Sequence, residues 1–418
     1  MMGKRKPALR FKGFEGEWET CRLGDNSDII TGGTPNTKVI EFWHPKEIPW
    51  LSSGEVNKKR INFTENMISQ SGLSNSSANW VKKNSVLIAL AGQGKTRGTV
   101  AITNIPLTTN QSVAAVIPND VLNPEFIFQN LESRYDELRT NSSGDRTRGG
   151  LNKRIIFETS ISAPKIEEQT KIGNLFKHLD ALITQQQRKY ESLQNVKKSM
   201  LEKMFPKDGA DVPEIRFKGF SGAWHMYKLD DIAERVTRKN TNLESTLPLT
   251  ISAQYGLVDQ ITYFNNRVAS ADVTNYYLVK KGEFAYNKSS SDGFPFGTVK
   301  RLERYEMGVL STLYIIFNPK NNNVNPDYLV SYYDTNNWHK DISERATIGA
   351  RNHGLLNISA DDFFDTKVKI PNSLEEQTKI GNFFKHLDTL LTQHQKKLDH
   401  LKHLKSALLE KMFVSEAA

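Results

Sequence analysis

The sequence predicts a mixed α/β (α+β) fold in which two globular domains are separated by two long helices, paired as an antiparallel coiled coil. The first observation is that the stretch from Ile166 to Phe205 is nearly repeated, without a gap, from Leu374 to Phe413. The second is that Pro7–Trp18 returns as Pro213–Trp224. The third is that the stretches between these repeats do not resemble each other. Repeats at a fixed spacing indicate duplication of a structural unit. We therefore predict a chain with pseudo-twofold internal duplication, whose two globular domains differ in sequence between the repeats.

Both long repeats have the apolar periodicity of an amphipathic helix. In the second, apolar residues recur at steps of three, four and seven from Ile380 to Met412, with His394 as a polar break. The first does the same from Ile172 to Met204. A helix this long must bury its stripe, and we expect the other copy to cover it; in the alternative, each helix packs only on its own domain. The residues expected to form the helix pairing are Leu179, Ile183, Leu193, Met200, Leu387, Leu391, Leu401 and Leu408.

Start and stop signals set the limits of these helices. Ser373 and Glu376 have the spacing of a capping box, and Pro206 follows the first helix. Lys165 stands where Ser373 caps the second helix, so the two helix starts are expected to differ. The predicted domains are a globular domain at 1–165, a long helix at 166–206, a second globular domain at 207–373 and a C-terminal long helix at 374–418.

Each globular domain mixes strand and helix patterns. Short β-branched and aromatic runs bounded by glycine or proline predict strands, and longer runs that begin with proline predict helices. The expected strands are 48–51, 85–90, 98–103, 282–286 and 308–317. The expected helices are 124–139 and 326–338.

Composition limits the class of protein. A chain of 418 residues is long enough for two or three domains with proper cores. The single cysteine, Cys21, excludes a disulfide framework and points to a reducing compartment. No apolar run approaches transmembrane length and no signal peptide is evident, so we expect a cytoplasmic protein with no membrane partner. The net charge of +9 favours a polyanionic partner, although many proteins are mildly basic.

One motif resembles an enzyme's phosphate-binding loop. Ala89–Thr96 nearly fits G-x-x-x-x-G-K-[ST], with alanine in place of the first glycine. A true phosphate-binding loop leads into a helix, whereas this one leads into the β-branched run Thr99–Thr103, so a nucleotide site is not favoured. Other catalytic motifs and paired cysteines are missing from the sequence. We therefore name no catalytic, cofactor-binding or metal-binding residue.

Two basic, glycine-rich segments recur at matching places in the two domains, Gly144–Arg154 and Glu344–Asn357. Arginine can bind guanine in the major groove and asparagine can bind adenine, while glycine lets the backbone approach phosphates. The alternatives are a solvated basic loop, or a reading site elsewhere, at Lys95, Arg97, Asn287 and Lys288. The candidate DNA-binding residues are Lys95, Arg97, Arg146, Arg148, Lys153, Arg154, Asn287, Lys288, Arg345, Arg351, Asn352 and His353.

Two unlike domains, each followed by a helix that begins P-x-x-E-E-Q-x-K-I, resemble the specificity (S) subunit of a Type I restriction–modification enzyme. The phrases that carry the resemblance are Ile166–Ile172 and Leu374–Ile380. Less specific similarities run through Gly32–Pro35 to Ile48–Ser52, Arg97–Gly98 to Asn110–Gln111, and Asn287–Lys288 to Gly308–Thr312.

The resemblance implies two target-recognition domains, each reading one half of a split, asymmetric site in double-stranded DNA. It also implies that the paired helices dock two methyltransferase (M) subunits, and that restriction (R) subunits join the full complex. S-adenosylmethionine, ATP and magnesium would belong to those partners. The chain lacks the [ND]-P-P-[YF] motif of adenine methyltransferases, so we expect a non-catalytic subunit. The alternative is a free-standing, two-headed DNA-binding or scaffold protein, which would not co-purify with a methyltransferase.

Overall fold

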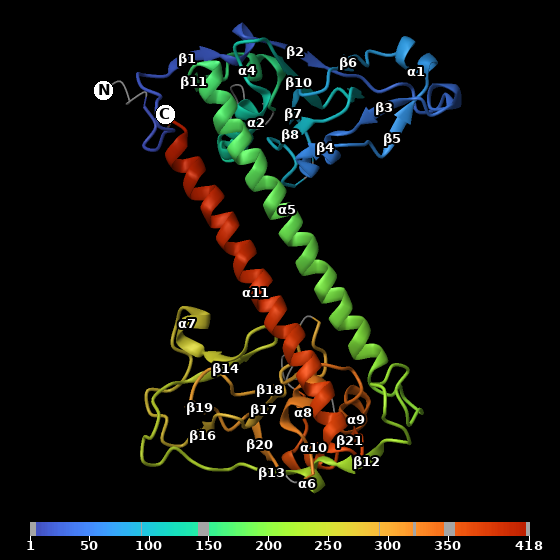
Figure 1. Cartoon of the computed structure of the whole chain (residues 1–418), viewed down its shortest axis with the longest axis vertical. Helices are drawn as coiled ribbons and strands as arrows, with labels where there is room; N and C mark the ends of the chain where they lie inside the picture. The colour runs from blue at the N-terminus through green and yellow to red at the C-terminus, as the bar shows by residue number, and fades with distance from the viewer. Residues whose placement is uncertain are drawn as a thin grey trace. The chain divides into compact units, whose positions relative to one another are not determined.

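The structure is a computed structural model that describes residues 6–92, 94–140, 150–291, 293–320, 323–346 and 356–414. It contains two compact units: Met1–Gln187 with Lys396–Ala418 form the first unit, and Arg188–Gln395 form the second unit. Two long helices, α5 (Ile166–Lys203) and α11 (Leu374–Met412), each contribute one half to each unit (Figure 1). The boundary between the two compact units therefore falls inside each long helix. The domain limits expected from the sequence, which treat each long helix as a separate part, stay a prediction. Within the described ranges, no helix is long and apolar enough to cross a membrane.

The first unit contains a five-stranded sheet, a four-stranded sheet and a separate pair of strands. The five-stranded sheet has the order β2-β10-β7-β8-β4, the four-stranded sheet has the order β5-β3-β9-β6, and β1 pairs with β11. The strands are β1 (Glu19–Arg22), β2 (Ser27–Thr31), β3 (Ile48–Leu51), β4 (Arg60–Ile61), β5 (Asn66–Ile68), β6 (Trp80–Val81), β7 (Val86–Ala89), β8 (Val100–Thr103), β9 (Leu107–Thr109), β10 (Val113–Pro118) and β11 (Ser160–Ala163).

The five-stranded sheet is buried on both faces. Alternate residues of β7 point to opposite sides, so Val86 and Ile88 enter one apolar cluster while Leu87 and Ala89 enter another. The first of these clusters also takes in apolar residues of α2 and α5. A sheet covered on both faces accounts for a strand that is apolar at every position.

Apart from its portions of α5 and α11, the first unit contains only short helices among the residues described. They are α1 (Gln70–Ser74), α2 (Pro124–Ser133), α3 (Tyr135–Thr140) and α4 (Lys153–Glu158), with 3-10 turns at Leu23–Asp25, Ile40–Phe42 and Ser53–Lys58. The prediction of a single helix at 124–139 is wrong, because the helix is interrupted at Arg134. The Arg134 guanidinium donates a hydrogen bond of 2.6 Å to the carbonyl oxygen of Ser160 and pairs with Glu137. This long-range contact fixes the break and is invisible in local periodicity.

The second unit contains one four-stranded sheet and three pairs of strands. The sheet has the order β13-β20-β17-β18, and the pairs are β12-β21, β14-β15 and β16-β19. The strands are β12 (His225–Lys228), β13 (Ala233–Arg235), β14 (Leu249–Ser252), β15 (Gly256–Asp259), β16 (Tyr277–Lys280), β17 (Phe284–Asn287), β18 (Thr298–Arg301), β19 (Met307–Leu310), β20 (Ile315–Pro319) and β21 (Lys367–Ile370). The shorter helices are α6 (Leu229–Ile232), α7 (Gln260–Phe264), α8 (Pro326–Tyr333), α9 (His339–Arg345) and α10 (Ala360–Phe364).

Two sequence expectations for the second unit are wrong. The strand expected at 308–317 is two strands, because the Tyr314 amide turns back onto the carbonyl of Ser311 and the chain changes sheet there. The helix expected at 326–338 ends at Tyr333, and a new helix begins after the buried Trp338. In both cases short polar stretches, Ser311–Thr312 and Asp334–Asn337, lie at the corner.

The duplication extends into the unlike domains. The order β2-β10-β7-β8 in the first unit corresponds to β13-β20-β17-β18 in the second. Both α2 and α8 begin with proline after an asparagine, Asn123 or Asn325, whose side chain accepts hydrogen bonds from the first turn. The two globules therefore share a framework that their sequences do not reveal.

The antiparallel pairing of the long helices is confirmed within each unit. In the first unit, Phe176 of α5 stacks on Phe413, directly after α11, at 5.8 Å between ring centroids. In the second, Phe384 of α11 meets Phe205, just beyond α5, at 5.9 Å. Each unit thus combines the N-terminal half of one helix with the C-terminal half of the other.

The eight residues predicted to form the helix pairing all turn away from solvent. Leu179 and Leu387 are buried, and the other six are half-buried. Leu193 and Met200 pack against a cluster that contains Ile380 and Phe384 of α11, and Leu408 packs against one that contains Phe176.

The start of α11 differs from the predicted capping box. The Ser373 hydroxyl accepts a hydrogen bond of 3.3 Å from the Glu376 amide, as a cap should. The Glu376 carboxylate, however, binds Arg216 instead of returning to the helix start. Half of the box is therefore replaced by a tertiary ion pair.

Candidate nucleic-acid interface and its supports

The repeated helix start is bound to the other repeated phrase by a buried ion pair. Glu168, which is 1% exposed, accepts two hydrogen bonds of 2.7 Å from the Arg10 guanidinium. Glu376, also 1% exposed, accepts bonds of 2.7 and 2.8 Å from Arg216. A bidentate arginine–carboxylate pair fixes orientation as well as distance. The two repeated segments, the one around Arg10 or Arg216 and the helix start around Glu168 or Glu376, therefore contact each other in the same way in both units. We call this contact the helix joint.

The glutamine after each of these glutamates holds the start of the globule's main helix. Gln169 donates 2.7 Å to the Pro164 carbonyl and accepts 2.9 Å from the Asn123 amide. Gln377 donates 3.0 Å to the Pro371 carbonyl and accepts 2.7 Å from the Asn325 amide. The sequence analysis did not predict these roles. The available signal was that the segment before each globule and the helix start after it are both repeated, which is expected of segments that contact each other.

A glycine in each helix lets α5 or α11 approach the globule closely. A Cβ at Gly381 would lie 2.8 Å from the Asp327 carbonyl carbon and from the Tyr328 amide nitrogen. At Gly173 the nearest atom would be the Glu125 Cβ, at 2.9 Å. These glycines are needed for packing, since neither has a positive φ.

We expect Gly381→Ala to lower the free energy of unfolding by about 1–3 kcal/mol, because the new methyl group meets backbone that cannot move aside. In an exposed helix the same change gains about 1 kcal/mol, so the sign is diagnostic. Chemical denaturation of the full chain measures it. Gly173→Ala should cost less, because its nearest backbone atom, the Phe126 amide nitrogen, is 3.2 Å away. A gain in stability at Gly381 would show that the helix can shift.

One lysine in each unit connects three elements, and we call these groups the lysine junctions. In the first junction, Lys405 of α11 lies 2.8 Å from Glu132 of α2 and 2.7 Å from Asp180 of α5. Asp180 also accepts from Arg60 at 2.9 Å and from Gln129 at 2.7 Å. Burial opposes ionisation of Asp180, but Lys405 and these hydrogen bonds hold its pKa below its usual value.

The second junction repeats this arrangement with the roles of the helices exchanged. Lys197 of α5 lies 2.8 Å from Asp334, next to α8, and 2.6 Å from Asp388 of α11. Lys300 adds a second cation, 2.7 Å from Asp334. Against the effect of burial, the two lysines depress the pKa of Asp334, whereas burial raises that of Asp388. Each junction joins a globule to both long helices.

A β-hairpin loop in the first unit is braced by α3. The loop, residues 90–99, joins β7 to β8 and contains the phosphate-loop-like segment, which leads into a strand and not a helix. Tyr135 donates 2.7 Å to the Lys95 carbonyl, and Arg97 donates 2.8 Å to the Arg139 carbonyl. The Lys95 side chain is exposed and Arg97 is half-buried. Both candidates therefore lie beside α3, Lys95 by a contact with its first residue and Arg97 by a contact near its last.

The hairpin loop at the matching place in the second unit, residues 288–297, joins β17 to β18. The Lys288 carbonyl accepts 3.0 Å from the Leu356 amide, and its ammonium lies 3.3 Å from the Ile358 carbonyl. Asn287 accepts 3.0 Å from the Ser289 amide. In both units, the hairpin thus lies next to the chain that flanks the basic glycine-rich segment.

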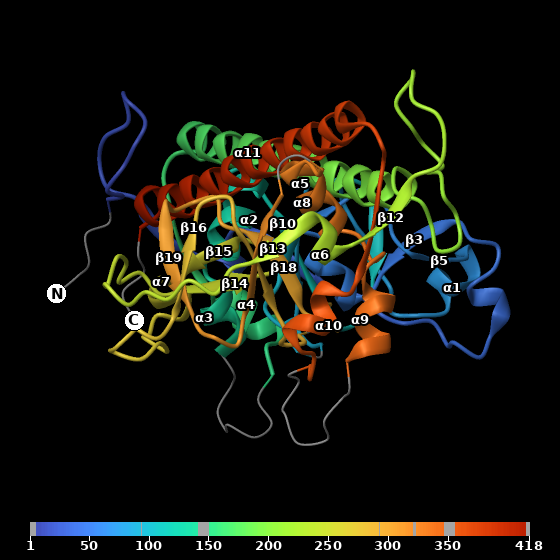
Figure 2. The ribbon, with the colours of Figure 1, turned by 90° about the horizontal axis from the view of Figure 1, so that it is seen from below.

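The remaining candidates have other surroundings. Arg345 of α9 is bound to Asp365 at 3.0 Å, where α9 and α10 lie side by side (Figure 2). Arg154, on α4, pairs with Glu158 at 2.9 Å, and Lys153 is exposed on the same helix. The predicted readers that lie outside the described residues are Arg146, Arg148, Arg351, Asn352 and His353. A role in DNA binding stays a prediction for all twelve.

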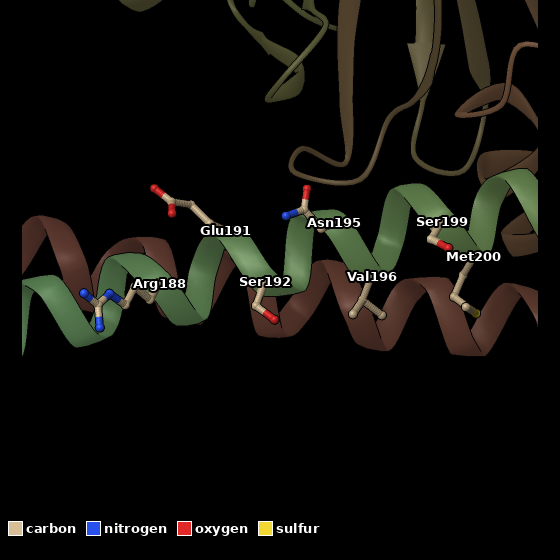
Figure 3. Close-up of a pocket in the computed structure, with 7 residues that line it drawn as sticks. All are labelled: Arg188, Glu191, Ser192, Asn195, Val196, Ser199 and Met200. Atoms are coloured by element: carbon tan, nitrogen blue, oxygen red, sulfur yellow. The ribbon is translucent and has the colours of Figure 1, made fainter. Parts of the chain in front are cut away.

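A shallow depression of about 500 Å³ lies along the second half of α5 (Figure 3). Val196 is 42% exposed there, and Leu404, at the matching position of α11, is 39% exposed. No group of side chains suited to hold a metal ion occurs among the residues the structure describes. The lining residues of the depression are Arg188, Glu191, Ser192, Asn195, Val196, Ser199 and Met200.

Comparison with known proteins identifies the family. The family model described as the Type I restriction modification DNA specificity domain matches residues 15–195 and 222–403. The chain belongs to this family, with two copies of the domain.

Individual relatives agree with the family. The chain is 29% identical over 180 residues to the Type I restriction enzyme EcoR124I/EcoR124II specificity subunit of Escherichia coli, covering 43% of this chain and 44% of that protein. It is 26% identical over 193 residues to the MjaIX specificity subunit of Methanocaldococcus jannaschii, covering 45% and 44%. The matches thus span less than half the length of these relatives.

The fold is similar to the crystal structure of the Type-I restriction-modification system S subunit from M. genitalium. The TM-score is 0.66 over 99% of this chain and 100% of that one, at 17% sequence identity. At this identity, the likeness concerns the fold.

Proposed function

We propose that the chain is the DNA-reading subunit of a Type I restriction–modification complex, and that each unit reads one half of a bipartite, asymmetric site. The observation that carries this proposal is that one framework occurs twice with different exposed loops. The sheet order, the helix joints and the lysine junctions recur, whereas the hairpins at 90–99 and 288–297 differ in sequence. A repeated framework with unlike loops suits recognition of two different half-sites.

The chemistry of the loops supports double-stranded DNA as the ligand. A two-stranded β-ribbon fits the major groove, where base pairs are distinguished by their hydrogen-bonding edges and by the thymine methyl group. Basic side chains beside each ribbon, such as Lys95 in the first unit, would contact phosphates or guanine. In this proposal the chain binds and orients DNA and performs no chemistry itself.

The partners we propose are two methyltransferase subunits, with restriction subunits in the full complex. S-adenosylmethionine, ATP and magnesium would be bound by those partners. The depression on α5 is a candidate docking face, because small side chains at Ser192 and Ser199 surround the exposed Val196. A partner side chain that entered this depression would cover Val196.

The decisive experiment is selection of duplexes from a randomised pool by the full chain, alone and with any adenine methyltransferase found to co-purify with it. We expect a split site, and we expect that replacing residues 21–163 with the same region of a relative changes only one half of it. A chain that binds DNA stably without any enzyme partner would support the free-standing alternative. A chimera with both half-sites altered would contradict separate reading.

The arginines fall into two groups that binding assays can separate. Arg148→Ala and Arg351→Ala should each cost about 1–3 kcal/mol and relax one base position, if the side chain reads a base. A phosphate contact would instead weaken all duplexes evenly and reduce the salt dependence. Arg345→Ala should chiefly destabilise the second unit, because this guanidinium is bound to Asp365. Relaxed specificity at Arg345 with unchanged stability would reverse this assignment.

Docking can be tested without DNA. We expect Val196→Asp to reduce co-purification of the methyltransferase at least about tenfold, because it places a charge in an apolar contact. Leu404→Asp should do the same at the matching position. The control is Lys198→Asp, an exposed position on the same helix outside the depression. Equal retention of the partner by all three variants would exclude these positions as a docking face.

A further inference from the structure

The two hairpin loops are equal in length but differ in the side chains they expose. The loop at 90–99 exposes Lys95, and the loop at 288–297 exposes Ser289, Ser291 and Phe294. Both follow an inner strand at the equivalent place in the two sheets, β7 or β17. If these hairpins contact DNA, the first unit offers a cation to it, and the second unit offers hydroxyl groups and an aromatic ring.

The second hairpin has backbone hydrogen bonds between Ser291 and Phe294 near its tip and further contacts at its base. Ser291 and Phe294 exchange two backbone hydrogen bonds, of 3.2 and 2.8 Å. At the base, the Tyr286 hydroxyl donates 2.9 Å to the Phe296 carbonyl, and the Phe296 ring lies 5.1 Å from the ring of His339. A Cβ at Gly297 would collide with the Asn287 carbonyl oxygen, which keeps the return strand close. These contacts reduce the ordering cost of positioning a side chain from this loop.

Phe294 is an aromatic side chain left open at this tip. It is 38% exposed, whereas Phe296, two residues on, packs against the apolar core of the second unit. Adjacent exposed groups are small or polar, as at Ser289, Ser291 and Pro295. Core packing therefore accounts for Phe296 and leaves the exposure of Phe294 unexplained.

We propose that Phe294 is a specificity-determining residue that packs against the C5 methyl group of one thymine in the half-site read by the second unit. The thymine methyl is the apolar feature of the major-groove edge, and phenylalanine is among the side chains that contact it. The serine hydroxyls beside the ring suit neighbouring base edges or phosphates. This assignment rests on the proposed function in DNA recognition.

The test uses the full chain together with the methyltransferase that co-purifies with it, and the duplex that this complex selects from a randomised pool. Each thymine of both half-sites is replaced in turn by deoxyuridine, which lacks only the methyl group. For the unaltered chain, one replacement in the second half-site should weaken binding about four- to tenfold, the range expected for losing one buried methyl contact. Phe294→Ala should weaken binding to the thymine duplex by a similar factor and be insensitive to that replacement.

The other thymines serve as controls for folding and binding. Deoxyuridine in the first half-site should affect both proteins equally, and Phe294→Leu should retain part of the preference for thymine. If Phe294→Ala binds like the unaltered chain, or weakens the thymine and deoxyuridine duplexes equally, the assignment is overturned. A complex that selects no duplex at all would contradict the proposed function, whereas a split site whose binding does not depend on Phe294 and a thymine methyl would contradict this assignment alone.

Discussion

Replacing Lys405 with methionine should lower the free energy of unfolding by about 3 kcal/mol, because it leaves two largely buried carboxylates without their shared cation. The Lys405 side chain is 11% exposed, and Glu132 and Asp180 are 16% and 17% exposed. Asp180 keeps Arg60 and Glu132 keeps Lys59, which holds the loss near the lower end for a broken buried pair. Chemical denaturation of the full chain measures the effect.

The matched variant in the second unit is Lys197→Met. Asp334 keeps Lys300, while Asp388, whose side chain is 43% exposed, can be hydrated, so we expect a loss of similar size or somewhat smaller. A control removes the orphaned charges: Lys405→Met combined with Glu132→Gln and Asp180→Asn should recover part of the stability. If Lys405→Met alone leaves the free energy of unfolding unchanged, the ion pairs of the junctions do not stabilise the fold.

The long helices and their pairing could be predicted because their signal is local. An apolar stripe that continues from Ile172 to Met204 and from Ile380 to Met412 needs a partner whatever lies beside it. Direction followed from the duplication, and the contacts of Phe176 with Phe413 and of Phe384 with Phe205 confirm it. The same kind of signal found β7 and β8 within the expected strands, and three of the four residues of β17.

The features that sequence could not supply depend on residues far apart in the chain. Lys405 meets Asp180 across a separation of 225 residues, and no periodicity predicts which lysine of a basic helix does so. The break at Arg134 likewise depends on a carbonyl group in β11. For the candidate site, the sequence found the basic segments and the hairpin residues, but not that Arg345 is bound to Asp365 or that Phe294 is exposed at a tip.

Inserting two residues into α5 after Gln187 should abolish folding of the second unit. This is where α5 passes from the first unit to the second. Two residues rotate everything downstream by about 200°, so Lys197, Met200 and Phe205 would face away from α11 and the globule. The first unit keeps its own half of α5, and the damage should be confined to contacts made by residues after the insertion. Limited proteolysis would show a protected first unit and a cleaved second one.

Inserting four residues changes the rotation by only about 40° and lengthens the helix by about 6 Å, so the stripe stays nearly aligned. Because α11 crosses back between Gln395 and Lys396, the matched variant carries four residues at both crossings. We expect this variant to fold, with Lys197 and Lys405 in their junctions. If helix length sets the distance between half-sites, duplex selection should return both half-sites unchanged, with the spacer longer by one or two base pairs, since a base pair rises about 3.4 Å. A folded variant that selects the original spacer would show that the helices do not set this distance.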